Sequence, residues 1–150
     1  MSARSKARKR ALDVLYEADV RGVNPLDVLA DVTARRQADE GVTPHDFTVV
    51  LVEGVQAHRT RIDDLVQSNS HGWVLSRMPA IDRNILRLGA FEILWGHDAP
   101  DAGVIDEAVN LARELSTDES PGFINGLLAR LVEMRPYLEL STDGSTAAAE

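Results

Sequence analysis

Residues 1–20 read MSARSKARKRALDVLYEADV, and this stretch joins a basic segment to an apolar stripe. The basic side chains all stand between positions 4 and 10, before the first acidic residue at Asp13: Arg4, Lys6, Arg8, Lys9 and Arg10. From Ala11 to Ala18 apolar residues recur every three or four positions, as on one face of an α-helix. We therefore predict a first helix whose start is cationic and whose later turns are anchored in a core.

The rest of the chain is acidic, because the 150 residues together carry a formal net charge of −8. An arginine guanidinium can bind two phosphate oxygens at once, and the unpaired N–H groups at a helix start also attract anions. The basic segment is therefore a candidate nucleic-acid contact. The alternative is a solvated terminus whose charges only keep the protein soluble.

Length and composition indicate a single globular domain, with 44% hydrophobic and 27% charged residues. No apolar run approaches the roughly 18 residues of a membrane span, so we expect no membrane partner. The sequence contains no cysteine. This excludes disulfides, thiolate zinc sites and cysteine nucleophiles, and it fits a reducing cytoplasm.

Helical periodicity continues to about residue 136, without the alternation of a β-strand. Helix starts are indicated at Asn24-Pro25, Thr43-Pro44 and Ser120-Pro121, each with a capping residue before proline. The pattern turns polar near His58, which indicates a third and a separate fourth helix, with one kinked helix as the alternative. We predict an all-α fold of about seven helices, followed by a disordered tail over residues 141–150.

The helix expected after Pro79 has an unusually broad apolar arc, from Ile81 to Trp95. Such an arc indicates a central helix packed on more than one side. It also leaves open a homodimer, in which the second copy would cover the basic helix and block RNA until a partner arrives. In the third helix, Gly54 would let a neighbouring helix approach closely.

Catalytic motifs are missing from the sequence. The four histidines (His45, His58, His71 and His97) are scattered, and there is no HExxH, GxSxG, Walker or GxGxxG pattern. We therefore expect no enzyme, no metal site and no cofactor.

Three blocks carry a resemblance to a known family: RSKARKRALDVLY (residues 4–16), IDRNILRLGAFE (residues 81–92), and IDEAVNLA with FINGLL (residues 105–112 and 123–128). In their order and spacing they resemble the NusB family of bacterial transcription antitermination factors. The resemblance spans about residues 4–132. One departure is Asp13, where the family often has glutamine, and this carboxylate could pair with Lys9 or Arg10 one turn earlier.

The resemblance implies two small packed helical bundles within residues 1–140. It implies binding to the boxA RNA of ribosomal RNA operons together with NusE, a small-subunit ribosomal protein, to help assemble an antitermination complex on RNA polymerase. The RNA surface would be Arg4, Lys6, Arg8, Lys9 and Arg10, with Phe123 as a stacking partner. The NusE surface would involve Tyr16, Asp82 and Arg87.

Each of these assignments has a simpler structural alternative. Phe123 could pack in the core, and Asp82 and Arg87 could be capping or intrahelical charges. The whole chain could be a non-catalytic scaffold for protein interactions without a specific RNA role. Because aromatic residues make up only 5% of the sequence, base stacking cannot be extensive, and we expect modest RNA affinity without a partner.

Overall fold

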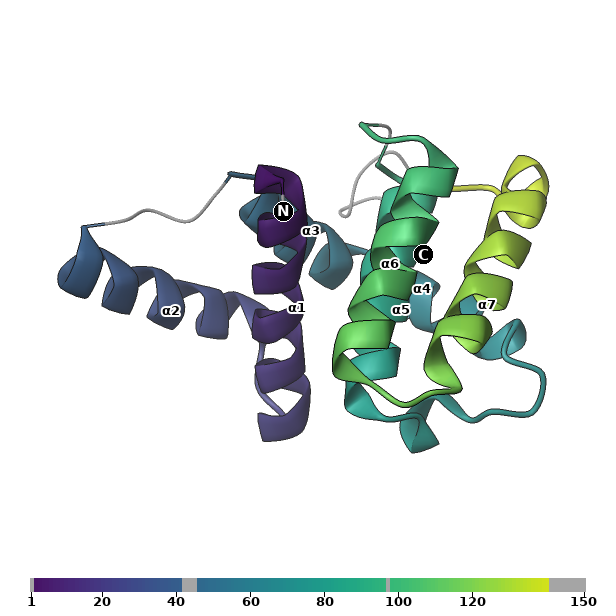
Figure 1. The fold of residues 1–150 in the computed structure, drawn as a ribbon, viewed down its shortest axis with the longest axis horizontal. Helices are drawn as coiled ribbons and strands as arrows, with labels where there is room; N and C mark the ends of the chain where they lie inside the picture. The colour runs from purple at the N-terminus through teal and green to yellow at the C-terminus, as the bar shows by residue number, and fades with distance from the viewer. Residues whose placement is uncertain (1, 42–45, 97, 141–150) are drawn as a thin grey trace.

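The computed structural model describes residues 2–41, 46–96 and 98–140, and this part of the chain is helical and contains no strand (Figure 1). The seven α-helices are α1 (Ala3–Arg21), α2 (Pro25–Glu40), α3 (Asp46–Ala57), α4 (Arg59–Ser68), α5 (Ala80–Leu94), α6 (Asp101–Leu115) and α7 (Ser120–Met134). Two 3₁₀ turns, η1 (Leu75–Arg77) and η2 (Arg135–Tyr137), precede α5 and follow α7. The all-α prediction of about seven helices is confirmed.

Capping residues define the first two helices. The Ser2 hydroxyl accepts a hydrogen bond from the Ser5 N–H at 3.0 Å, and α1 ends at Gly22 in the left-handed region with φ 69°. The Asn24 side chain accepts from the Leu26 N–H at 2.9 Å, and Pro25 is the first residue of α2. The predicted start at Asn24 is therefore confirmed. Helix α7 does begin at Ser120, but its capping position is Glu119, and the Ser120 hydroxyl donates to Asp82 instead of capping the helix. Thr43, Pro44 and the tail from 141 lie outside the described residues.

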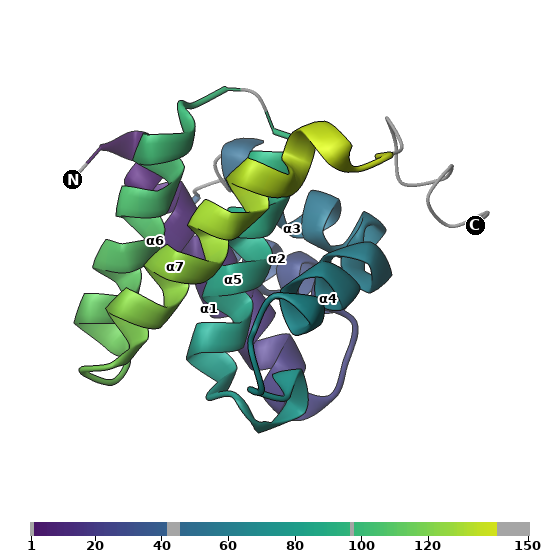
Figure 2. The same ribbon diagram turned by 90° about the vertical axis from the view of Figure 1, so that its right-hand side faces the viewer.

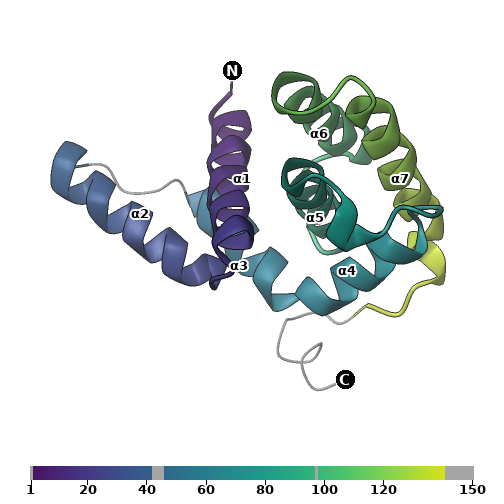
Figure 3. The same cartoon turned by 90° about the horizontal axis from the view of Figure 1, so that it is seen from below.

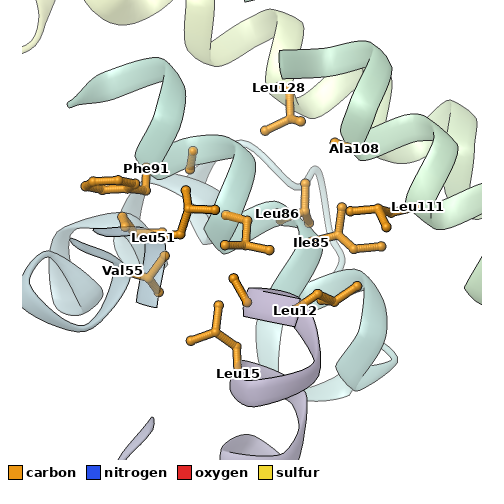
Figure 4. Close-up of a cluster of buried hydrophobic side chains, with 14 of the residues drawn as sticks. Leu12, Leu15, Leu51, Val55, Ile85, Leu86, Phe91, Ala108, Leu111 and Leu128 are labelled. Carbon is orange, nitrogen blue, oxygen red and sulfur yellow. The ribbon is translucent and has the colours of Figure 1, made fainter. Parts of the chain in front are cut away.

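Helix α5 is the centre of the fold. Seen from below, α1, α2 and α3 lie on one side of it, and α4, α6 and α7 on the other (Figure 3). Seen from the side, α7 crosses in front of α5, with α6 and α4 to its left and right (Figure 2). Fully buried side chains of the flanking helices, Leu12, Leu51 and Leu128, pack around Leu86 of α5 (Figure 4). The two small bundles therefore share one continuous core across α5.

The broad apolar arc of α5 is covered within the chain. Every residue from Asn84 to Leu94 is buried. Helix α3 approaches α5 closely at Gly54, where an added Cβ would lie 2.2 Å from the Phe91 ring. The expectation for Gly54 is thus confirmed. The arc itself gives no support to the homodimer hypothesis, because other helices of the same chain already pack on it.

Candidate RNA interface and partner surface

The start of α1 presents the basic segment. Its first turn contains no acidic residue, and the Ser2 cap places the helix beginning at Ala3. Arg4, Lys6 and Arg10 are exposed, and Lys9 is half-buried. Lys6 and Arg10 form no ion pair with any residue that the structure describes, so their charges are available to an external anion.

Arg8 lies elsewhere than the sequence predicted. Only 6% of it is exposed, and its guanidinium donates two hydrogen bonds of 2.8 Å to the Glu92 carboxylate on α5. A second carboxylate, on Glu107 of α6, lies 3.8 Å from it. Hydrogen bonding to Glu92 raises the pKa of Arg8 in spite of its burial. Arg8 therefore anchors α1 to α5. The five basic residues do not together form one exposed surface, and the assignment of Arg8 to the RNA surface is wrong.

The other cations of the segment have their own neighbours. The Arg4 guanidinium lies 4.2 Å from the centre of the Phe47 ring and 3.5 Å from the Asp98 carboxylate. The Lys9 ammonium donates to Glu114 of α6 at 2.5 Å, and this contact raises the pKa of Lys9. Lys9 thus pairs across helices with Glu114 rather than along its own helix with Asp13.

Phe123 lies half-buried at the start of α7, beside an aromatic residue that sequence reasoning did not assign. The ring of Trp73 lies 5.6 Å from that of Phe123, centre to centre, and 49% of Trp73 is exposed. The two rings line a groove of about 490 Å³ whose other walls are Pro79, Asp82 and the segment 117–120. A flat ring can enter such a groove and stack, so Trp73 belongs with Phe123 in the candidate RNA interface. Its signal in the sequence was a tryptophan in an expected loop.

The three residues expected on the partner surface do not form one exposed patch. Tyr16 is exposed on α1, next to a short run of exposed apolar side chains: Val20, Val23 and Leu26. Asp82 is buried, with 5% exposed, and accepts hydrogen bonds from the hydroxyls of Ser116 and Ser120. It therefore ties the start of α5 to the connection between α6 and α7 instead of facing a partner.

Arg87 is also buried, with 4% exposed. Its guanidinium donates to both oxygens of Asp63 on α4, at 2.8 and 3.1 Å, and to Asp19 on α1 at 3.1 Å. Asp19 also accepts hydrogen bonds of 2.8 Å from Arg83 and Asn84. Burial alone would raise the pKa of Asp19, but these donors and the two arginine charges outweigh burial and lower it. Arg87 is therefore not an exposed surface charge, and its ion pairs are not within its own helix. It joins α5 to α1 and α4.

Within the described residues, no three His, Cys, Asp or Glu side chains are grouped as metal ligands require. In the same part of the chain, no helix has the length and apolar character needed to cross a membrane.

The sequence profile of the NusB family matches residues 5–133. The chain belongs to the NusB family. It is 52% identical to the transcription antitermination protein NusB of Streptomyces avermitilis over 139 residues, which cover 92% of this chain and 96% of that protein. The corresponding protein of Nocardioides sp. is 54% identical over 138 residues, covering 92% and 99%.

Solved NusB structures share the fold. The T. maritima NusB structure superposes with a TM-score of 0.77 at 28% identity, covering 88% of this chain and 92% of that one. A crystal structure of the antitermination factors NusB and NusE in complex with dsRNA matches with a TM-score of 0.73 at 26% identity, covering 87% and 96%. The chain is therefore a transcription antitermination factor and not an enzyme.

Proposed function

We propose that this NusB-family chain binds boxA-type RNA of ribosomal RNA operons together with NusE, and that it helps to assemble the antitermination complex on RNA polymerase in the cytoplasm. The observation that carries the proposal is the pair of exposed cations, Lys6 and Arg10, which have no ion pair among the described residues. Lys6 lies about one turn from a helix start that contains no acidic residue, where an anion is favoured, and Arg10 lies one turn further along α1. The solved complex of a NusB relative with NusE and dsRNA supports the same partners.

The RNA surface has two parts with different chemistry. Exposed or half-exposed cations of α1 contact phosphates: Arg4, Lys6, Lys9 and Arg10. A base stacks on the half-exposed Trp73 in the groove that Trp73 and Phe123 line, because the two rings, 5.6 Å apart, leave no room for a base between them. Arg8 contributes indirectly, because its bonds to Glu92 hold α1 in place. Residues 1–140 act as the RNA-binding unit.

The NusE surface centres on Tyr16 and the exposed apolar side chains that follow it on α1 and the start of α2. Tyr16 is 38% exposed, and an exposed tyrosine beside apolar side chains suits a protein interface. Arg87 supports this surface from inside, whereas Asp82 bonds to Ser116 and Ser120 and lines the Trp73–Phe123 groove. Arg87 bonds to Asp19, one turn after Tyr16, and so fixes the segment of α1 that the partner contacts.

The test is RNA binding by the purified chain. Fluorescence anisotropy should compare a boxA-like oligoribonucleotide with a scrambled one, with and without NusE, across a range of salt concentrations. Four phosphate contacts predict a slope of log affinity against log salt of roughly −2 to −3. NusE should tighten binding to the boxA-like RNA more than to the scrambled RNA. Equal affinity for the two RNAs in every condition would favour the protein-interaction scaffold.

A further inference from the structure

Helix α6 lies between the two parts of the proposed RNA surface. In two views at right angles, α1 stands on one side of α6 and α7 on the other (Figures 1 and 3). An RNA strand that runs from α1 to the Trp73–Phe123 groove across the face seen in Figure 1 therefore passes α6. The charge on the side of α6 that faces α1 then affects every such complex.

That side of α6 is acidic and already holds the basic segment. Glu107 and Glu114 are two helical turns apart, so they share a face of α6. The Glu114 carboxylate accepts from Lys9 at 2.5 Å, and the Glu107 carboxylate accepts from the Ser5 hydroxyl at 2.5 Å. Both carboxylates thus occupy donors of α1 that would otherwise be open to a phosphate.

The Lys9–Glu114 pair is weaker than the buried Arg8–Glu92 pair. Lys9 and Glu114 are partly exposed, with 36% and 47% of their side chains accessible. Exposed pairs contribute little free energy and are screened by salt. The Arg8–Glu92 pair, by contrast, is buried and does not open without leaving a charge unpaired. Only the outer pair can exchange a carboxylate for a phosphate at low cost.

We propose that Glu114, assisted by Glu107, acts as an intramolecular competitor of RNA for the basic face of α1, and so lowers the affinity of the chain for RNA. RNA binding requires the Lys9–Glu114 pair to open, after which a phosphate takes the place of the carboxylate on Lys9. The proposal rests on the RNA-binding function above and adds residues that limit it. It also accounts for how an acidic chain can carry a basic segment without attracting every polyanion.

The test uses two RNA probes, a boxA-like oligoribonucleotide and an oligouridylate of equal length. Glu114→Gln should tighten binding of both by about two- to fivefold at low salt, and the gain should shrink as salt rises. The matched control is Glu133→Gln on α7, which removes the same charge from an exposed glutamate without an ion pair to any described residue. In the background of Lys9→Ala, the substitution of Glu114 should give no gain, because the pair no longer exists.

Three results would overturn the competitor role: no gain with Glu114→Gln, an equal gain with Glu133→Gln, or a gain that persists without Lys9. No gain with Glu114→Gln would mean that Glu114 does not influence RNA binding. Either of the other two results would mean that Glu114 acts only through the net charge of the chain. Failure of the RNA function has a different signature. If the wild-type chain binds both probes equally while Glu114→Gln still tightens both, the competitor stands and the boxA preference is wrong.

Discussion

Arg8 and Glu92 form a buried, two-pronged ion pair between α1 and α5, with both hydrogen bonds at 2.8 Å. Arg8, which the sequence grouped with the RNA-binding cations, is therefore a structural residue that anchors α1 to α5. It holds the helix whose neighbouring cations stay at the surface. The arrangement separates two tasks within one short segment: Arg8 positions α1, and Lys6 and Arg10 face the solvent.

Loss of this pair should reduce stability strongly. Arg8→Ala leaves Glu92 buried without its partner, and we expect the free energy of unfolding to fall by about 3–5 kcal/mol. Urea denaturation followed by circular dichroism measures the change. The control is Arg10→Ala, an exposed residue two positions away, which should stay within about 0.5 kcal/mol of wild type. A similar small change for Arg8→Ala would show that the pair does not brace the helix.

The Trp73–Phe123 groove predicts a loss of RNA affinity that does not depend on charge. Trp73→Ala should weaken binding by about 1–3 kcal/mol for the base that stacks there, while the slope of affinity against salt stays unchanged. Trp73→Phe should recover most of the loss, since it keeps an aromatic face. Tyr137→Ala, an exposed aromatic residue in η2, serves as the control. If both alanine variants bind as wild type does, the groove takes no base.

The lowered pKa of Asp19 predicts a dependence of stability on pH. Asp19 is a stronger acid in the folded chain than in the unfolded one, so the folded state binds fewer protons. Its contribution is complete above the ordinary aspartate pKa of about 3.9 and is lost as the pH falls through and below that value. Asp19→Asn should therefore be less stable than wild type at pH 7, and the difference should narrow toward pH 2.

Denaturant titrations of both proteins between pH 7 and pH 2 measure this difference. Asp64→Asn, an exposed residue on α4, is the control and should follow wild type throughout. If the difference in the free energy of unfolding between Asp19→Asn and wild type stays constant with pH, the charge of Asp19 does not contribute to stability.

The partner surface predicts that two substitutions separate binding from folding. Tyr16→Asp places a charge on an exposed position, so it should weaken NusE binding while the unfolding midpoint changes little. Asp82→Lys breaks the hydrogen bonds from Ser116 and Ser120 at a buried site, so it should destabilise the chain itself. Size-exclusion co-elution with NusE and thermal denaturation give the two readouts. Undiminished co-elution of Tyr16→Asp would place the interface elsewhere.

Local patterns predicted the helices, because capping residues and apolar spacing act over a few residues. Asn24 before Pro25 and the polar break at His58 are both found where they were expected. One signal for Arg8 was present but unused: it precedes Leu12 by four residues and Leu15 by seven, so it lies on the buried face of α1. Its burial was predictable, although its partner was not.

Tertiary partners could not be predicted, because they come from distant parts of the chain. Glu92 is 84 residues from Arg8, and Glu114 is 105 residues from Lys9. The same applies to Arg87, whose acceptors lie on α1 and α4, and to Trp73, which meets Phe123 only after α4, α5 and α7 have packed. The predicted site residues are therefore wrong mainly where a charged side chain pairs with a residue of another helix, as Arg8 and Arg87 do.

The exposed cations of α1 are the proposed contacts for RNA phosphates, and these contacts set how strongly salt weakens binding. The most direct measurement is the salt dependence of boxA-like RNA binding by wild type, Lys6→Ala/Arg10→Ala, and a control with two other arginines removed, Arg35→Ala/Arg61→Ala on α2 and α4. Loss of two phosphate contacts should flatten the log–log slope by about 1.4 for the first variant, with helicity retained. The control should keep a slope close to wild type. Equal slopes for wild type and Lys6→Ala/Arg10→Ala would contradict the account.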